Sequence, residues 1–200
     1  MVHDSYISGD TSALVLERCT PGAPLNATVS APEQDEVVAS LLRRLWQAPA
    51  RPTPFRPLQG MCDAWVDEFR AKLDAGRTTS LDPVLVDRGL ELFRALPATA
   101  EREAVLCTDL HAGNILAAQR EPWLVIDPKP YLGDPTYDPL QHMLNCDERL
   151  TADPVGFARR MASLLDLDPE RLTTWLFARC VLESVEQPYL AGVATRLAPG

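Results

Sequence analysis

The sequence predicts an α+β protein in which a mostly helical body carries a small group of strands. Three observations lead to this fold class. Apolar residues recur with the three-to-four-residue spacing of helices through most of the chain. Between residues 104 and 126 the pattern changes to short apolar runs separated by polar turns, which is typical of strands. A single β-like run near the N-terminus adds a strand before the helices.

The N-terminal elements follow from local sequence signals. Residues 11–18 (TSALVLER) predict a strand, which a proline- and glycine-rich stretch then interrupts. A helix is expected over residues 32–47, because Pro32 suits a first helical turn and acidic residues follow it near the positive end of the helix. Residues 47–57 are rich in proline, which has no amide hydrogen to donate, and they are expected to form a loop.

The remaining elements are assigned in the same way. Met61, Trp65, Phe69 and Leu73 repeat every four residues and form one apolar helical stripe, and Asp82 followed by proline begins another helix. The inward residues expected on that second helix are Leu85, Val86, Leu92, Phe93 and Leu96. Strands are expected at residues 104–107, 115–117 and 123–126, and further helices at residues 139–146, 154–165 and 169–186.

The composition excludes several classes of protein. With 19 basic and 28 acidic residues the net charge is −9, so we expect no nucleic-acid partner and favour a cationic one. No apolar run approaches the roughly 20 residues that span a bilayer, and the N-terminus lacks a signal sequence, so we expect no membrane partner and a cytoplasmic location. Five scattered cysteines predict reduced thiols rather than disulfides or a zinc site.

Most of the unusual polar residues lie between residues 108 and 138. Asp109 follows one predicted strand, Asn114 precedes the next, and Asp127 ends the third. If the strands around Ile115 and Val125 pair as a hairpin, Asn114 and Asp127 lie at the same end of it. Two such oxygen donors suit Mg²⁺, and Asp109 could accept a proton from an attacking hydroxyl. The alternative is that two turns happen to be rich in Asp and Asn.

The arrangement D-x₄-N-x₁₂-D resembles the catalytic segment of the protein-kinase-like phosphotransferases. DLHAGNIL followed by VIDPKPYLGDPTYD is similar to the aminoglycoside phosphotransferases, specifically their streptomycin and hydroxyurea kinase group. ALVLERCTPGAPL resembles the last N-lobe strand and the hinge of that group. The resemblance extends from about residue 11 to at least residue 146. It implies a mostly helical C-lobe with a catalytic β-hairpin and a remnant of the N-lobe sheet.

The resemblance also implies cofactors and roles. Asp109 would orient or deprotonate the acceptor hydroxyl, and His111 would contact the transferred phosphoryl group or support the loop from behind. Asn114 and Asp127 would hold Mg²⁺ against ATP. The backbone at Glu17 and Cys19 would meet the adenine ring. Asp138 would brace the catalytic loop by accepting backbone amides, and Asp134 would be structural.

The implied domain organisation has three parts. Residues 1–18 would be remnant N-lobe strands, residues 19–30 a hinge and connection, and residues 31–200 the helical C-lobe. Within the C-lobe the catalytic loop would be residues 107–114 and the metal-binding segment residues 123–138. Residues 13–16 would form an unpaired apolar strand edge, through which we expect self-association.

The sequence departs from the family pattern in three respects. Cys107 and Thr108 replace a histidine and a glycine of the usual HGDLH, and a left-handed backbone at Thr108 would be strained. No Gly-rich loop precedes the hinge. The only lysines, Lys72 and Lys129, are not placed to pair with nucleotide phosphates as the family's N-lobe lysine does. Cys107 as a nucleophile is an alternative that lacks a histidine to activate it.

The favoured interpretation is a Mg²⁺- and ATP-dependent kinase that phosphorylates a hydroxyl of a cationic aminoglycoside such as streptomycin. Two alternatives stay open: an inactive binding module of the same fold, and a kinase for another small molecule such as hydroxyurea. Candidate carboxylates for a cationic substrate are Asp147, Glu148, Glu183 and Glu186, although acidic helix faces are usually solvated surface.

Overall fold

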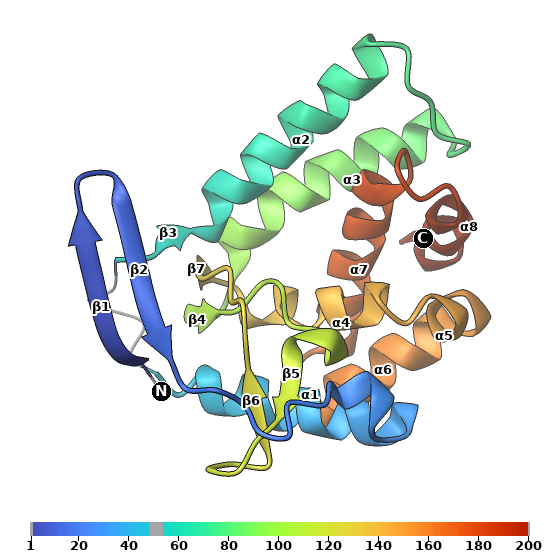
Figure 1. Cartoon of the computed structure of the whole chain (residues 1–200). Coiled ribbons are helices and arrows are strands. Elements are labelled where there is room, and N and C mark those ends of the chain that lie inside the picture. The colour runs from blue at the N-terminus through green and yellow to red at the C-terminus, as the bar shows by residue number, and fades with distance from the viewer. Residues whose placement is uncertain (1, 49–53, 200) are drawn as a thin grey trace.

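Helices make up most of the chain, which the computed structural model describes over residues 2–48 and 54–199 (Figure 1). The α-helices are α1 (Ala31–Leu45), α2 (Leu58–Asp74), α3 (Pro83–Ala95), α4 (Leu140–Leu144), α5 (Asp147–Ala152), α6 (Pro154–Leu165), α7 (Pro169–Glu183) and α8 (Tyr189–Leu197). Short 3₁₀ helices are η1 (Leu25–Ala27), η2 (Leu96–Thr99), η3 (Ala112–Asn114) and η4 (Pro135–Tyr137). Over the described ranges, every helix is too short or too polar to cross a bilayer.

The strands form three small sheets. They are β1 (Val2–Ser8), β2 (Thr11–Leu16), β3 (Arg56–Pro57), β4 (Ala104–Leu106), β5 (Ile115–Ala117), β6 (Trp123–Val125) and β7 (Tyr131–Gly133). One sheet pairs β1 with β2 and another pairs β5 with β6, both antiparallel. In the third, β7 lies between β3, which is parallel to it, and β4, which is antiparallel. The loop that contains Asp109 follows β4 of the third sheet and precedes β5 of the β5–β6 sheet.

The predicted helices and the predicted strands are confirmed, with boundaries that differ by a few residues. At the start of α1, the Glu33 carboxylate accepts hydrogen bonds from the backbone and hydroxyl of Ser30. The prediction of a loop over residues 47–57 is wrong at its C-terminal end, because Arg56–Pro57 forms β3 and pairs with β7. Residues 49–53 of that loop lie outside the described residues. The separate bounds of β1 within residues 1–18 were not predicted, and β7, α5 and α8 were missed because they are short or lack a clear apolar period.

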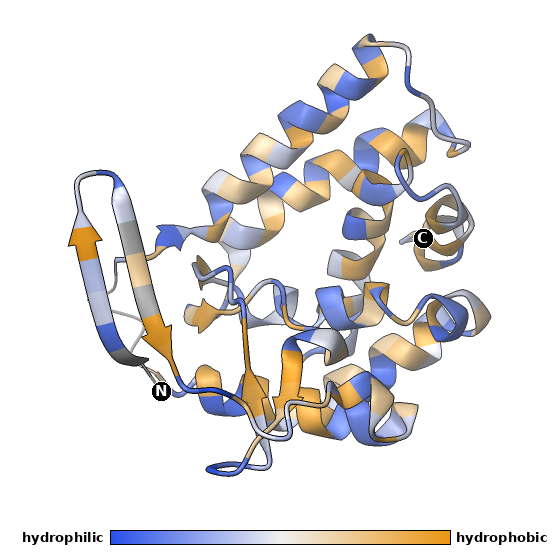
Figure 2. Ribbon diagram, in the orientation of Figure 1, coloured by the Kyte–Doolittle hydropathy of each residue, from blue (hydrophilic) through white to orange (hydrophobic). Residues whose placement is uncertain are grey.

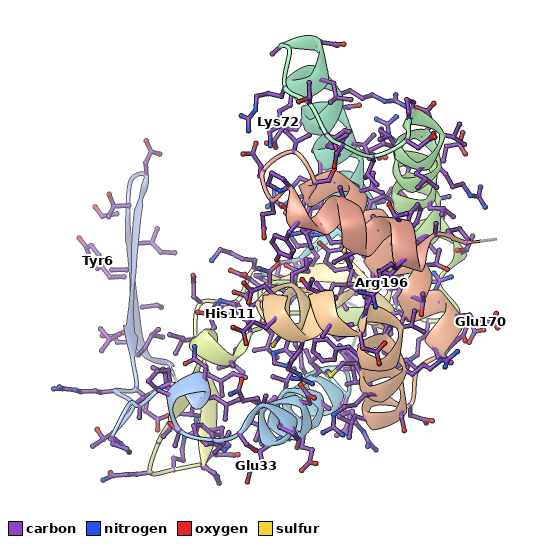
Figure 3. All side chains as sticks on the ribbon, turned by 90° about the vertical axis from the view of Figure 1, so that its right-hand side faces the viewer. Tyr6, Glu33, Lys72, His111, Glu170 and Arg196 are labelled. Carbon is purple, nitrogen blue, oxygen red and sulfur yellow. The ribbon has the colours of Figure 1, made fainter. Side chains whose placement is uncertain are left out.

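The N-terminal strands stand beside the helical body as a hairpin, and two perpendicular views show this separation (Figures 1 and 3). The expectation of an unpaired edge at residues 13–16 is wrong along one side. There β2 pairs with β1, with Ala13 opposite Tyr6 and Val15 opposite Asp4. Residues 2–8, which precede the predicted strand, form β1, so this edge of β2 has a hydrogen-bonded partner strand. Large apolar side chains are nevertheless exposed on this hairpin at Tyr6, Ile7, Val15 and Leu16.

The apolar core is formed mainly by the helices, along which hydrophobic and hydrophilic segments alternate in Figure 2. Phe93, Tyr137 and Trp175 meet edge to face in its centre, with ring centroids 5.1 to 6.2 Å apart. Gly133 lets β7 approach the start of α2, since a Cβ atom there would lie 2.5 Å from the Cβ of Leu58. The core thereby connects α2, α3 and α7 to the short strands.

A buried carboxylate joins four helices at the other end of the body. Asp35 of α1 is fully buried and accepts hydrogen bonds from His142 at 2.9 Å, Arg149 at 2.6 and 2.9 Å, and Arg160 at 2.7 Å. Burial raises the pKa of Asp35, but these three donors outweigh burial and hold the pKa well below its usual value. The carboxylate therefore connects α1 to α4, α5 and α6.

Replacing this carboxylate should destabilise the fold. We expect Asp35→Asn to lower the free energy of unfolding by about 3 kcal/mol at pH 7, because Arg149 and Arg160 lose their buried partner. Because folding lowers the pKa of Asp35, its contribution is complete above about pH 4 and falls away in more acidic solution. The variant should therefore lose less stability than the native chain on acidification. Urea unfolding at pH 3 to 7 measures both effects, with Asp87→Asn on the exposed side of α3 as the control.

Candidate active site

The loop between β4 and η3 is held by the buried carboxylate of Asp138. Its Oδ1 accepts hydrogen bonds from the backbone amides of Cys107 at 3.0 Å and Thr108 at 2.7 Å. Its Oδ2 accepts from the indole of Trp46 at 3.0 Å. The predicted bracing role of Asp138 is confirmed. Burial raises the pKa of Asp138 to about 6 against the opposing effect of these donors, so the carboxyl is ionised at pH 7.

The two departures from the usual motif have clear physical consequences. Thr108 has a φ of 54°, a left-handed conformation that strains a β-branched residue. Its hydroxyl donates a 2.6 Å hydrogen bond to the backbone oxygen of Lys129, which a glycine could not do. Burial raises the pKa of the Cys107 thiol to about 12, so this side chain is protonated and unsuited to nucleophilic attack.

The two candidate metal ligands lie at one end of the β5–β6 hairpin. Ile115 pairs with Val125, and the amide of Ile126 donates to the backbone oxygen of Asn114 at 2.9 Å, so the predicted hairpin is confirmed. The side-chain nitrogen of Asn114 donates to the backbone oxygen of Asp109 at 3.1 Å. Because the side-chain nitrogen of Asn114 is used in this bond, its side-chain oxygen is the atom that could bind a metal ion. The carboxylate of Asp127 is 67% exposed at the same end. The donor set fits Mg²⁺, which prefers a few oxygen ligands and retains water or phosphate.

Lys129 lies between the two carboxylates of the site. Its ammonium nitrogen is 2.7 Å from Oδ2 of Asp127 and 3.7 Å from Oδ2 of Asp109. The hydrogen bond to Asp127, followed by smaller effects of both carboxylates, raises the pKa of Lys129, so the side chain is a cation at neutral pH. The structure thus places Asp109 and Asp127 close enough for one ammonium group to contact both carboxylates.

A cavity of about 480 Å³ opens beside Asp109. Its lining includes several residues that sequence reasoning did not assign to the site, among them Arg56, Trp65, Tyr131 and Arg179. Arg179 is stacked 4.1 Å above the Trp65 ring, and Arg56 donates to the hydroxyl of Tyr131 at 3.2 Å. One available signal was Arg179 itself, a lone charge in the apolar run LFARCVL of a buried helix. The cavity size suits a small organic acceptor.

The other predicted site residues lie around this centre. His111 is the N-cap residue of η3, and its Nδ1 accepts a hydrogen bond from the backbone amide of Gly113 at 3.1 Å, so the proton of a neutral ring is on Nε2 (Figure 3). The Glu17 carboxylate accepts from Arg120 at 2.8 Å, near the turn of the hairpin. Cys19 precedes residues 22–24, whose backbone pairs with β5. Their roles remain predictions.

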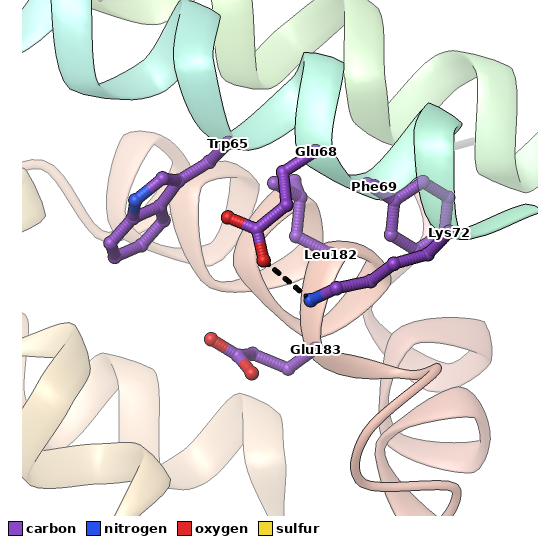
Figure 4. Close-up of a pocket in the computed structure, with 6 residues that line it drawn as sticks. All are labelled: Trp65, Glu68, Phe69, Lys72, Leu182 and Glu183. Atoms are coloured by element: carbon purple, nitrogen blue, oxygen red, sulfur yellow. Dashed lines mark ion pairs between the residues drawn. The ribbon is translucent and has the colours of Figure 1, made fainter.

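A second cavity, of about 290 Å³, shares Trp65 with the first (Figure 4). Glu68 and Glu183 line it, and Lys72 forms an ion pair with Glu68 at 2.8 Å. Glu183, one of the predicted acidic candidates, also pairs with Arg179 at 2.8 Å. Glu68 and Glu183 are therefore the acidic side chains that line this neighbouring cavity, and the sequence indicated only Glu183.

The buried carboxyl of Asp138 should make the free energy of unfolding depend on pH. Because folding raises the pKa of Asp138 from 3.8 to about 6, the folded chain binds this proton more tightly, and the contribution to stability falls as pH rises from about 4 to about 6. Asp138→Asn removes this titration. It should also lower the free energy of unfolding by about 1–3 kcal/mol at pH 7, since an amide accepts fewer hydrogen bonds. Urea unfolding at intervals between pH 4 and 7 compares the two slopes, and equal slopes would contradict the assignment.

The chain is similar in sequence to known proteins. Residues 6–188 match the family model described as aminoglycoside/hydroxyurea antibiotic resistance kinase. Streptomycin 6-kinase of Streptomyces griseus is 36% identical over 183 residues, covering 85% of this chain and 56% of that protein. Hydroxyurea phosphotransferase of Kitasatospora aureofaciens is also 36% identical over 183 residues, covering 86% and 50%. This chain spans about half the length of these curated relatives.

Solved structures share the fold. Choline kinase LicA from Streptococcus pneumoniae has a TM-score of 0.59 at 12% identity, covering 97% of this chain and 71% of that one. LicA in complex with AMP has a TM-score of 0.63 at 12% identity, covering 96% and 70%. The expected protein-kinase-like fold is thereby confirmed. Because the family model matches nearly the whole chain and both curated relatives are more than one-third identical, this chain belongs to the aminoglycoside/hydroxyurea antibiotic resistance kinase family.

Proposed function

We propose that this chain carries the catalytic half of an ATP-dependent phosphotransferase whose acceptor is an alcohol. One observation carries the proposal: Asp109 borders a cavity of acceptor size on one side and connects to Asn114 and Asp127 on the other. Positioning and charge stabilisation account for most of the catalysis of phosphoryl transfer, and these three side chains supply both. The AMP complex of a neighbour with the same fold supports ATP as the donor.

Each residue has a chemical task in this proposal. Asp109 orients the acceptor hydroxyl and takes its proton as that oxygen attacks the γ-phosphate of ATP, with ADP as the leaving group. Asn114 and Asp127 would hold Mg²⁺, which neutralises phosphate charge when bound. Asp127, at the end of the hairpin, has a left-handed backbone with a φ of 49°. The backbone at residues 17–24, which lies along β5 at residues 22–24, would contact the adenine ring.

We propose an aminoglycoside of the streptomycin type as the acceptor. The streptomycin kinase relatives and the negative net charge of the chain support this choice. A hydroxyl of the acceptor would enter the cavity beside Asp109. A cationic group would extend past Trp65 towards Glu68 and Glu183, and there it would compete with Lys72 and Arg179, which pair with these carboxylates in the structure.

A small neutral acceptor such as hydroxyurea is the second candidate. The hydroxyurea phosphotransferase relative is as similar to this chain as the streptomycin kinase. In addition, Asp109 is the one carboxylate among the described residues that line the 480 Å³ cavity, where Arg56, Lys129 and Arg179 are cations. This lining favours an acceptor that brings little positive charge into the cavity itself.

The proposal is tested by following transfer from labelled ATP in the presence of Mg²⁺ to streptomycin and to hydroxyurea. We expect Asp109→Asn to reduce kcat by about 10²- to 10⁴-fold, because the acceptor hydroxyl loses its proton acceptor. Asp87→Asn, an equivalent change on the exposed face of α3, should leave kcat unchanged.

The acceptor that is phosphorylated separates the two candidates. Streptomycin binding in a calorimeter without any transfer would instead favour the inactive binding module. Equal activity of Asp109→Asn and the native chain would contradict the catalytic assignment.

We also propose that the chain self-associates through its N-terminal hairpin. Tyr6, Ile7, Val15 and Leu16 are 57–78% exposed there, and the sheet of β1 and β2 has no third strand within the described ranges. Sedimentation velocity should show a larger species as concentration rises, and Ile7→Lys should reduce it. Val84→Lys, a similarly exposed apolar position on α3, serves as the control. A chain that stays monomeric at high concentration would contradict the proposal.

A further inference from the structure

The backbone of Lys129 is fixed more firmly than its exposed side chain suggests. Its amide donates to the backbone oxygen of Cys107 at 3.0 Å, and its carbonyl accepts from the hydroxyl of Thr108 at 2.6 Å. Pro128 and Pro130 flank it, so the backbone φ angles on either side are restricted. Lys129 is thereby attached to the same two residues that Asp138 holds in place.

This attachment limits where the ammonium group can go. From a fixed backbone, the side chain reaches Asp127 at 2.7 Å and Asp109 at 3.7 Å. The two carboxylates would otherwise repel each other across a short distance, and the ammonium offsets both charges. Any divalent cation that binds Asp127 meets this positive charge on the same carboxylate.

We propose that Lys129 is the built-in counter-ion of the candidate metal site and competes with the divalent cation for Asp127. Without nucleotide, the ammonium occupies the Asp127 carboxylate and weakens the binding of free metal. When the metal arrives with nucleotide phosphates, whose negative charge favours both cations, the ammonium is released towards Asp109. Lys129 is in this sense a positioning residue, and the proposal rests on the proposed function because it requires Asp127 to be a metal ligand.

The test measures metal binding rather than activity. Mn²⁺ binding to the nucleotide-free chain, followed by the electron paramagnetic resonance signal of free Mn²⁺, should be roughly two- to tenfold tighter for Lys129→Met than for the native chain, given the modest strength of an exposed ion pair. Lys129→Arg keeps the charge and should bind like the native chain. Lys72→Met removes the other lysine, which pairs with Glu68 in the second cavity, and should not change the affinity. Asp127→Asn should abolish binding.

The outcomes distinguish this proposal from the proposed function. If Asp127→Asn loses Mn²⁺ but Lys129→Met binds no more tightly than the native chain, Lys129 is not a competitor, while the metal site stands. An equal gain in Lys129→Met and Lys72→Met would reflect overall charge and would also overturn the proposal. If neither the native chain nor Lys129→Met binds Mn²⁺, the metal site itself is absent and both proposals fail. Thermal unfolding of each variant verifies that it is folded.

Discussion

The arrangement of the candidate site depends on one buried carboxylate, that of Asp138. It accepts the amides of Cys107 and Thr108, which would otherwise be buried without partners, and it reaches across to the indole of Trp46 on the segment that ends α1. The loop that presents Asp109 is therefore attached to the helical body at its base. The strained backbone of Thr108 is tolerated because hydrogen bonds from both its amide and its hydroxyl hold it there.

From that base the other features of the site follow in sequence. The hydroxyl of Thr108 holds the backbone of Lys129, and the ammonium of Lys129 lies between Asp109 and Asp127. The hairpin brings Asn114 to the same end as Asp127, and the side chain of Asn114 returns to the backbone of Asp109. Each contact restricts the next residue, so three oxygen donors and one cation occupy a small, organised volume beside a cavity. Such preorganisation is what phosphoryl transfer requires of a protein.

The parts of the site that the sequence could predict are local in the chain. Asn114 and Asp127 are brought together by a hairpin of two three-residue strands, and apolar runs reveal such a hairpin. The bracing role of Asp138 came from the resemblance rather than from any pattern, since 31 residues separate it from Cys107. The approach of Lys129, Arg56 and Arg179 to Asp109 depends on packing among segments that are separated in sequence. No periodicity encodes those distances.

The main helices and strands, the candidate catalytic residues and the family could be predicted from the sequence, because apolar spacing and short motifs are properties of neighbouring residues. The packing of separate elements establishes how β1 covers one edge of β2, which residues line the cavity, and which charges face each other. Asp35 illustrates the difference: its position in α1 reads as an ordinary acidic residue near a helix start, yet it is fully buried among His142, Arg149 and Arg160. Burial and long-range ion pairs arise only when separate helices pack, since the energy of a charge depends on its surroundings in space.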